Sequence, residues 1–427
     1  MILVHRVEIE SELIYMWQVI VNERVKCVEI RRKIDEVFDV LVNRMKDVKN
    51  FDLYLGRSGI CLFFAYYSNI SKRANSELED CIDGIIDTMS HYTIENVKEL
   101  TFFAESFWLL CHLYEMKKID MNIDNYFLNS DRQLYMGMEM LLREKEYGCI
   151  NGGISIAMYF YYRYILGDYK SKLYLDRFVD ILKDISIEHD NTIRWICTVD
   201  YGTYEQGYNL GIAHGIPGIL LFLRKLYLKN IKVDEIEMLL LKSCNFMLQQ
   251  KHSLETHKSY FYNVSNLSGI GHDTRLGWCY GDMSVGYALY LISLIQLSNY
   301  KDIRKEAEEI LIETTKRTNL LDIGIVDAGI CHGTSSIAHM YHRLYSLTSK
   351  LEFRNSAQYW YDETLKMVKS ENEYAGYKLP YYLKDSEKDI RELHNLSFLT
   401  GISGIGLSLI SAIYPIEPTW DMSLLLS

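Results

Sequence analysis

Strongly apolar runs recur along the chain, and most of them follow a short stretch that contains glycine. Six such runs read ICLFFAYY, ISIAMYFYY, ILLFLRKLY, YALYLISLI, IAHMYHRLY and LSLISAIY. The glycines before five of these runs take equivalent places, at steps of about 50 to 70 residues. These glycines are Gly152, Gly215, Gly281, Gly333 and Gly401. Self-similarity at such a period predicts an architecture built from repeats.

A further copy begins at Gly56, and its step to Gly152 is about twice as long as the others. The glycine-free run Leu100–Tyr114 lies midway and is interpreted as a degenerate copy, which makes seven units of roughly helix–turn–helix size. Each unit pairs an apolar helix with a more charged one, such as Lys301–Lys316. We therefore expect an all-α fold in which apolar helices pack inside an outer amphipathic layer. Closing the array into a ring would bring the glycine turns to one end.

Two stretches interrupt the helical pattern. Asn191–Asn209 is rich in β-branched and aromatic residues, and Tyr260–Thr274 is rich in glycine and polar residues, so both are predicted as loops or short strands. Residues 1–45 are expected to form a helical extension packed on the ring. Residues 46–427 are expected to form the ring domain itself, because no linker divides them.

Composition narrows the choice of partner and compartment. The formal net charge of −11 argues against nucleic acid, which needs a basic patch, and is compatible with a basic peptide. The nine cysteines show no disulfide-framework spacing. Met1–Lys26 lacks the features of a signal peptide, and no stretch reaches about 18 uncharged apolar residues. A cytoplasmic protein is the expectation.

Two thiols and one imidazole lie in corresponding turns. Cys279 opens one glycine turn, and Cys331 and His332 take the same place in the next. If the turns converge, three protein ligands meet and leave a fourth position open, which is typical of catalytic zinc. The alternative reading, a small buried hydrophobe, is preferred for four other cysteines: Cys61, Cys111, Cys149 and Cys244.

Three motifs together give the chain a family resemblance. GIAHGIPG, RLGWCYG and GICHG occur in order between about Leu53 and Tyr414, and in this combination the chain resembles the lanthionine synthetase C-like family, the cyclases of lantibiotic biosynthesis. The resemblance implies an α/α toroid with seven inner and seven outer helices. Many members carry a small inserted domain, and the two irregular stretches are candidates for a reduced version of it.

The resemblance also implies a reaction and a set of site residues. A cysteine thiol of a dehydrated precursor peptide adds to dehydroalanine or dehydrobutyrine and forms a thioether ring. Residues that match the family pattern are Cys279, Cys331 and His332 as ligands of one zinc ion, His214 as the acid–base histidine, and Arg275 and Tyr280 as active-site neighbours. Implied partners are the precursor peptide with its leader, a lantibiotic dehydratase and an exporter, with association at the inner membrane face through that complex.

Structural alternatives stay open for three of these residues. His214 could cap a helix, Arg275 could belong to a structural ion pair, and Tyr280 could serve packing alone. His339 and His342 are interpreted as core or surface histidines.

One departure from the family pattern bears on function. Active members usually carry an aspartate four residues before the first glycine of the second motif, where this chain has Gly148. Other polar residues are candidates to replace it: Glu146, Asn151, His272, Asp273, Asp282 and Asp327. The missing aspartate leaves open a second reading, in which the protein keeps the metal site but acts as a peptide-binding or scaffold subunit. A third reading, a toroid acting on glycans or prenyl groups, is disfavoured because paired Cys and His ligands suit thiol chemistry better.

Overall fold

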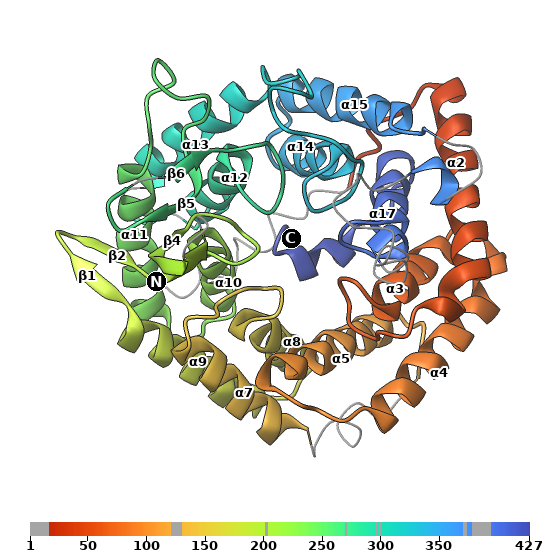
Figure 1. Cartoon of the computed structure of the whole chain (residues 1–427), viewed down its shortest axis with the longest axis horizontal. Helices are drawn as coiled ribbons and strands as arrows, with labels where there is room; N and C mark the ends of the chain where they lie inside the picture. The colour runs from red at the N-terminus through yellow and green to blue at the C-terminus, as the bar shows by residue number, and fades with distance from the viewer. Residues whose placement is uncertain are drawn as a thin grey trace, which may run out of the picture.

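The helices form two concentric rings in the computed structural model, which describes residues 17–120, 130–200, 204–269, 271–295, 297–298, 300–369, 374–377 and 394–427 (Figure 1). Within these residues the inner ring consists of α3 (Arg57–Tyr67), α5 (Leu100–Glu115), α8 (Gly153–Ile165), α10 (Ile216–Leu228), α12 (Asp282–Ser293), α14 (Thr334–Thr348) and α17 (Ile402–Ile413). The outer ring consists of α2 (Arg24–Arg44), α4 (Asn75–His91), α7 (Asp131–Arg143), α9 (Ser171–Ile185), α11 (Val233–Gln249), α13 (Tyr300–Thr314) and α15 (Leu351–Lys366). The predicted α/α toroid is confirmed.

The two layers differ in burial as the hydrophobic pattern requires. Every residue of α12 is buried, because this helix is enclosed on all sides. Its outer partner α13 buries only Ile303, Ala307, Ile310, Leu311 and Thr314, which recur at helical spacing on one face. The ring closes where α17 packs against α3 and α2.

Glycine stands at the N-cap of six inner helices. These residues are Gly56, Gly152, Gly215, Gly281, Gly333 and Gly401, the set predicted as equivalent. Only Gly281 among them has a positive φ, +97°, which a residue with a side chain rarely adopts. Helix α5 begins instead after the 3₁₀ turn Val97–Glu99, so the degenerate copy is confirmed as the remaining inner helix.

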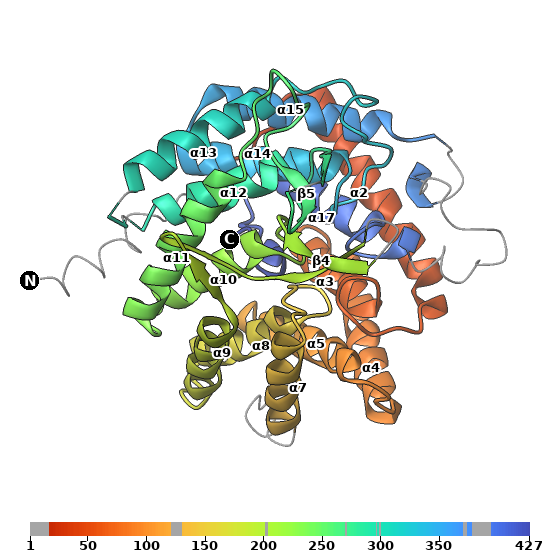
Figure 2. The same cartoon turned by 60° about the vertical axis from the view of Figure 1, so that its left-hand side comes forward.

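The two irregular stretches contain short strands, as expected. A hairpin pairs β1 (Ile187–His189) with β2 (Thr192–Arg194). An antiparallel sheet in the order β3 (Cys197–Asp200), β4 (Tyr204–Asn209), β5 (Tyr262–Asn266) and β6 (Gly271–Asp273) joins the two stretches through β4 and β5. Figure 2 shows β4 and β5 beside α10 and α12, where β4 leads into the turn before α10.

Both ends of the described chain pack on the inner ring. The Trp17 indole donates to the carbonyl of Ser411 at 2.8 Å, and the backbone N–H groups of Ile20 and Val21 donate to Ala412. The 3₁₀ segment Thr419–Leu424 brings the C-terminus toward the centre of the ring (Figure 1). Residues 1–16 lie outside the described residues, and the division at residue 45 stays a prediction. Helix α2 occupies the outer layer next to α17.

Shorter 3₁₀ segments join the main elements. They are Met45–Asp47, Lys72–Ala74 and Tyr374–Gly376. In the part of the chain that the structure describes, each helix is too short or too polar to cross a membrane.

Candidate metal centre

Backbone hydrogen bonds tie the glycine turns to one another. The N–H of Cys279 donates to the carbonyl of Cys331 at 3.2 Å, and the N–H of Cys331 donates to Leu399 at 2.9 Å. The N–H of Leu399 in turn donates to Tyr54 at 2.9 Å. Each of these four residues stands two places before its N-cap glycine. This belt of hydrogen bonds therefore makes the same position of successive turns adjacent in space.

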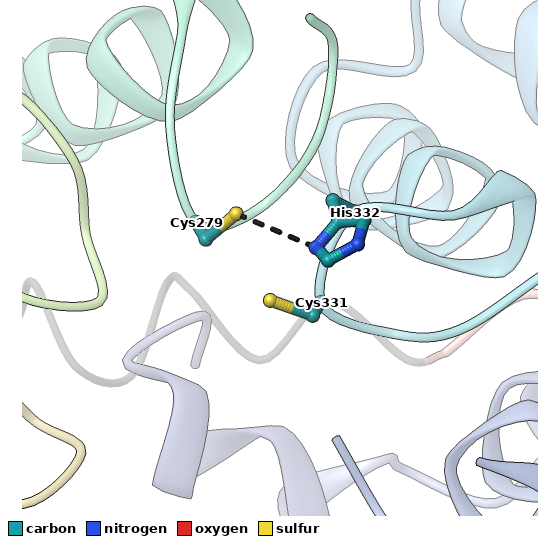
Figure 3. Close-up of side chains that lie close together, drawn as sticks. All are labelled: Cys279, Cys331 and His332. Carbon is teal, nitrogen blue, oxygen red and sulfur yellow. Dashed lines mark hydrogen bonds between the residues drawn. The ribbon is translucent and has the colours of Figure 1, made fainter. Parts of the chain in front are cut away.

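Cys279 and Cys331 occupy adjacent positions in this belt, and their side chains converge with that of His332 (Figure 3). One ligand atom from each of Cys279, Cys331 and His332 lies within 4.8 Å of the others. Sγ of Cys279 is 3.9 Å from Nδ1 of His332. Cys279 is buried, whereas Cys331 and His332 are only partly buried. The three predicted ligands are thus brought together.

The pKa values of the two thiols are shifted in opposite directions. Their mutual hydrogen bond lowers the pKa of Cys279 well below its usual range, and His332 and the charge of Arg275 act in the same direction. The same hydrogen bond raises the pKa of Cys331. Two sulfurs and one imidazole nitrogen form a donor set that suits zinc, and with three protein ligands a tetrahedral ion keeps one position for a substrate. The residues present therefore fit a metal ion.

His214 occupies the turn before α10, one place before the N-cap Gly215. Its side chain is accessible to solvent, yet surrounding protein atoms remove part of its hydration, and this desolvation lowers its pKa. The charge of Cys279 acts on the same imidazole and raises its pKa, which places His214 within electrostatic reach of the ligand group. His332 takes the corresponding place before Gly333, so two equivalent turns each present a histidine.

Arg275 and Tyr280 flank the same group. The guanidinium of Arg275 lowers the pKa of both cysteines, so its charge acts on the ligands directly. The Tyr280 hydroxyl accepts a 3.4 Å hydrogen bond from Nδ2 of Asn209, and its ring packs so closely on Gly211 that a Cβ there would lie 2.5 Å from it. Burial raises the pKa of Tyr280. Tyr280 therefore has a packing role, whether or not it also contacts substrate.

Comparison with known proteins identifies the family. The family model described as lanthionine synthetase C-like protein matches residues 47–425. The chain belongs to this family. Among solved structures, nisin cyclase is similar in fold, with a TM-score of 0.73, at 19% sequence identity. The match covers 93% of this chain and 98% of nisin cyclase. The family resemblance expected from the three glycine motifs is confirmed.

The place where active lanthionine synthetase C-like proteins are expected to carry aspartate is tightly filled in this chain. A Cβ at Gly148 would lie 2.6 Å from the carbonyl oxygen of Ile150 and 2.8 Å from Nδ1 of His214. A side chain at position 148 therefore requires the backbone at Ile150 or the His214 ring to shift. A hydrogen bond from the N–H of Cys149 to Ala213 at 3.0 Å holds the two turns in this contact.

Most of the polar residues that could replace this aspartate are engaged elsewhere. Asp282 accepts hydrogen bonds from the N–H groups of Tyr260 and Phe261 and pairs with Arg317 at 3.2 Å. The other engaged candidates are Asp273, which accepts from Lys258 N and Ser259 Oγ, Glu146, which pairs with Lys98, and Asn151, which accepts from Thr101. His272 is exposed on β6. Asp327 alone among these carboxylates approaches a metal-ligand candidate, with Oδ2 3.6 Å from Nε2 of His332.

Asn209 is a site residue that the sequence analysis did not single out. Its Oδ1 accepts from the N–H of Gly211 at 3.1 Å, and its Nδ2 donates to Tyr280. Asn209, Asp327 and Asn395 each stand six places before an N-cap glycine. That shared spacing is the signal that could have identified it.

Proposed function

We propose that this protein is a zinc-dependent lanthionine cyclase. The observation that carries the proposal is the convergence of Cys279, Cys331 and His332 at one group of turns, within a chain of the lanthionine synthetase C-like family. The reaction adds a peptide cysteine thiol to dehydroalanine or dehydrobutyrine. A sulfur–carbon bond forms at the β-carbon, the α-carbon gains a proton, and no oxidant or reductant is needed.

The first requirement of this reaction is a deprotonated peptide thiol. A free thiol has a pKa of about 8.5 and is mostly protonated at neutral pH. Zinc held by the three side chains would supply an open position at which the peptide thiol gives up its proton and is held as a nucleophile. The partial exposure of Cys331 and His332 supports this role, because a peptide must reach that position.

The chain's own residues manage the proton and the developing charge. Desolvation keeps His214 neutral near pH 7, so it can take the thiol proton and return it to the α-carbon. In this proposal Arg275 stabilises the enolate oxygen, and the action of its charge on both cysteines supports that role. Tyr280 orients the substrate beside the ligands.

The partners follow from the substrate. The precursor peptide must be dehydrated before cyclisation and exported afterwards, so we propose a complex with a dehydratase and an exporter. Such a complex would hold this protein at the inner membrane face.

A scaffold role is the alternative, and one observation favours it. Position 148 lacks the usual carboxylate, and a Cβ there would lie 2.8 Å from Nδ1 of His214, so a side chain requires the turn to shift. In this alternative the metal group binds peptide thiols without accelerating their addition.

The deciding experiment counts free thiols in a dehydrated, cysteine-containing precursor peptide. The peptide is incubated with zinc-loaded protein, alkylated and weighed by mass spectrometry. We expect thiols to disappear with wild type and with Thr400→Ala, which alters the equivalent place of the α17 turn, but at least about 100-fold more slowly with His214→Ala. Peptide that binds but keeps its thiols at the uncatalysed rate would favour the scaffold.

A further inference from the structure

The two carboxylate oxygens of Asp327 face different neighbours. Oδ1 accepts a hydrogen bond from the N–H of Gly329 at 2.8 Å and so closes the turn before α14. A Cβ at Gly333 would lie 2.4 Å from this oxygen, which shows how closely the turn wraps around it. Oδ2 takes no part in the turn.

Equivalent turns show that closing the turn does not require a carboxylate. Asn209, at the same place before α10, accepts from the N–H of Gly211 at 3.1 Å through its amide oxygen. Gly215 wraps around that oxygen as Gly333 does around Asp327, with a Cβ distance of 2.4 Å. Asn395 takes this place before α17. The second oxygen of Asp327 is therefore an addition to the common turn, found where the metal ligands are.

The environment of Oδ2 points to His332. Asp327 is 6% exposed, and among the described residues Oδ2 is buried without a hydrogen bond. A buried carboxylate oxygen without a donor is costly, typically about 1–3 kcal/mol or more. Nε2 of His332 is 3.6 Å away, while Nδ1 of the same ring faces Sγ of Cys279. The imidazole thus lies between the carboxylate and the thiols.

From this arrangement we infer that Asp327 is a positioning residue for the metal ligand His332. Oδ2 accepts the Nε2–H of His332, which fixes the tautomer that leaves the Nδ1 lone pair free to bind a metal ion. The present separation of 3.6 Å exceeds an N–H···O distance of about 2.9 Å, and a small rotation of the ring would close it. Carboxylates in this outer position typically raise metal affinity about 10–100-fold. The inference rests on the proposed zinc site.

Asp327→Asn tests the inference with a residue that the equivalent turns already use. The amide oxygen keeps the bond to Gly329, but an NH₂ group then faces Nε2 and favours the tautomer that cannot bind through Nδ1. Zinc affinity is measured by chelator competition, and cobalt(II) absorption reports the ligand geometry. We expect affinity to fall about 10–100-fold and the cobalt bands to shift.

Two further variants separate positioning from folding. Asp327→Ser keeps a short acceptor for the N–H of Gly329 but lacks the second oxygen. If Asp327→Asn lowers the melting temperature of the metal-free protein, the zinc affinity of Asp327→Ser is used instead. Asp52→Asn is the matched control, because Asp52 is equally buried and accepts from the N–H of Leu55 in the turn before α3, which carries none of the three ligands. Asp52→Asn should bind zinc like wild type.

The outcomes are distinct. Weaker zinc binding and altered cobalt bands in both Asp327 variants, but not in Asp52→Asn, support the inference. Wild-type affinity and an unchanged cobalt spectrum in folded Asp327→Asn and Asp327→Ser overturn it while leaving the zinc site in place. A wild-type protein that binds no zinc overturns the zinc site itself, and the inference with it.

Discussion

Helix α14 carries two polar clusters that contain histidine, and they are built on opposite principles. At its N-terminal turn, His332 lies with two cysteines, and one ligand atom from each of the three residues lies within 4.8 Å of the others. Further along the helix, His339 and Arg343 are fully or nearly buried and surround Asp421. The first cluster leaves ligand atoms available, and the second uses its charged groups internally.

The buried cluster is held together by short hydrogen bonds to Asp421. Oδ2 of Asp421 is 2.7 Å from Nε2 of His339 and 2.7 Å from Nε of Arg343, and Oδ1 is 2.9 Å from Nη2 of Arg343. Burial raises the pKa of Asp421, but Arg343 and His339 outweigh it and lower the pKa to about 2. The interpretation of His339 and His342 as core or surface histidines is settled in favour of the core. The charged groups around Asp421 are paired with one another and are thus structural, whereas the converging ligand atoms of Cys279, Cys331 and His332 are the candidate for chemistry.

Cys331→Ala should have the largest effect of these variants. It should change zinc binding by Cys279, Cys331 and His332 and leave the cluster around Asp421 unaffected. Removing one of three ligands is expected to lower zinc content from one ion per chain to nearly none, measured by atomic emission after dialysis. The melting temperature of the metal-free protein should change little, because Cys331 is only partly buried. Cys244→Ala, which removes a buried thiol from α11, is the control and should keep its zinc. A full zinc complement in Cys331→Ala contradicts the ligand assignment.

Asp421→Asn should disrupt the buried cluster of Asp421, His339 and Arg343 and leave the metal-ligand group intact. Losing the charge that pairs with buried Arg343 is expected to lower the free energy of unfolding by about 3–5 kcal/mol in urea titrations of metal-free protein. Glu417→Gln, which alters a carboxylate that is 42% exposed on the same arginine, should cost less than about 1 kcal/mol. Equal losses in the two variants would contradict the distinction.

The stability of wild type and of Asp421→Asn should also depend differently on pH. The pKa of Asp421 is lower in the folded state than in the unfolded state, so its stabilisation is present above about pH 4 and is lost as the pH falls toward 2. Wild type should therefore lose stability across that window more steeply than Asp421→Asn.

Gly148→Asp should slow thiol consumption on the order of 10–100-fold, because the new side chain must displace His214 or the backbone at Ile150. Gly148→Ala brings the same Cβ without a carboxylate and should also slow the reaction. An accelerated rate in Gly148→Asp alone would mean that a missing carboxylate, and not a filled space, separates this chain from the usual family pattern.

Tyr280→Phe should have the smallest effect. It removes a hydroxyl whose hydrogen bond to Asn209 is long, 3.4 Å, and keeps the ring that packs on Gly211. Loss of one such bond corresponds to about 0.5–1.5 kcal/mol, so the rate should fall about two- to tenfold. A loss as large as that of His214→Ala would make the hydroxyl part of the acid–base machinery.

Much of the architecture could be predicted because it is periodic. The glycines at the helix N-caps and the apolar runs behind them repeat, and the run Leu100–Tyr114 could be recognised without its glycine from its place in the series. The ligand group could be predicted for the same reason, since Cys279 and Cys331 take one place in consecutive turns.

Contacts between turns could not be read from the sequence. The filled space at Gly148 depends on how the turn before α10 sits against the turn before α8. That Asp327 is the candidate acid beside His332 could also not be predicted. It depends on which of the other carboxylates bind their own neighbours, as Asp282 does with Arg317. Both are matters of packing across long sequence separations, which spacing alone does not encode.

The most direct test of the central claim removes the metal and returns it. Protein stripped with a chelator is mixed with a dehydrated, cysteine-containing precursor peptide, and free thiols are counted before and after one equivalent of zinc is added. The account predicts that thiols persist at the uncatalysed rate in the stripped sample and are consumed once zinc is restored, with no recovery in Cys331→Ala. Thiol loss at the same rate with and without zinc would contradict it.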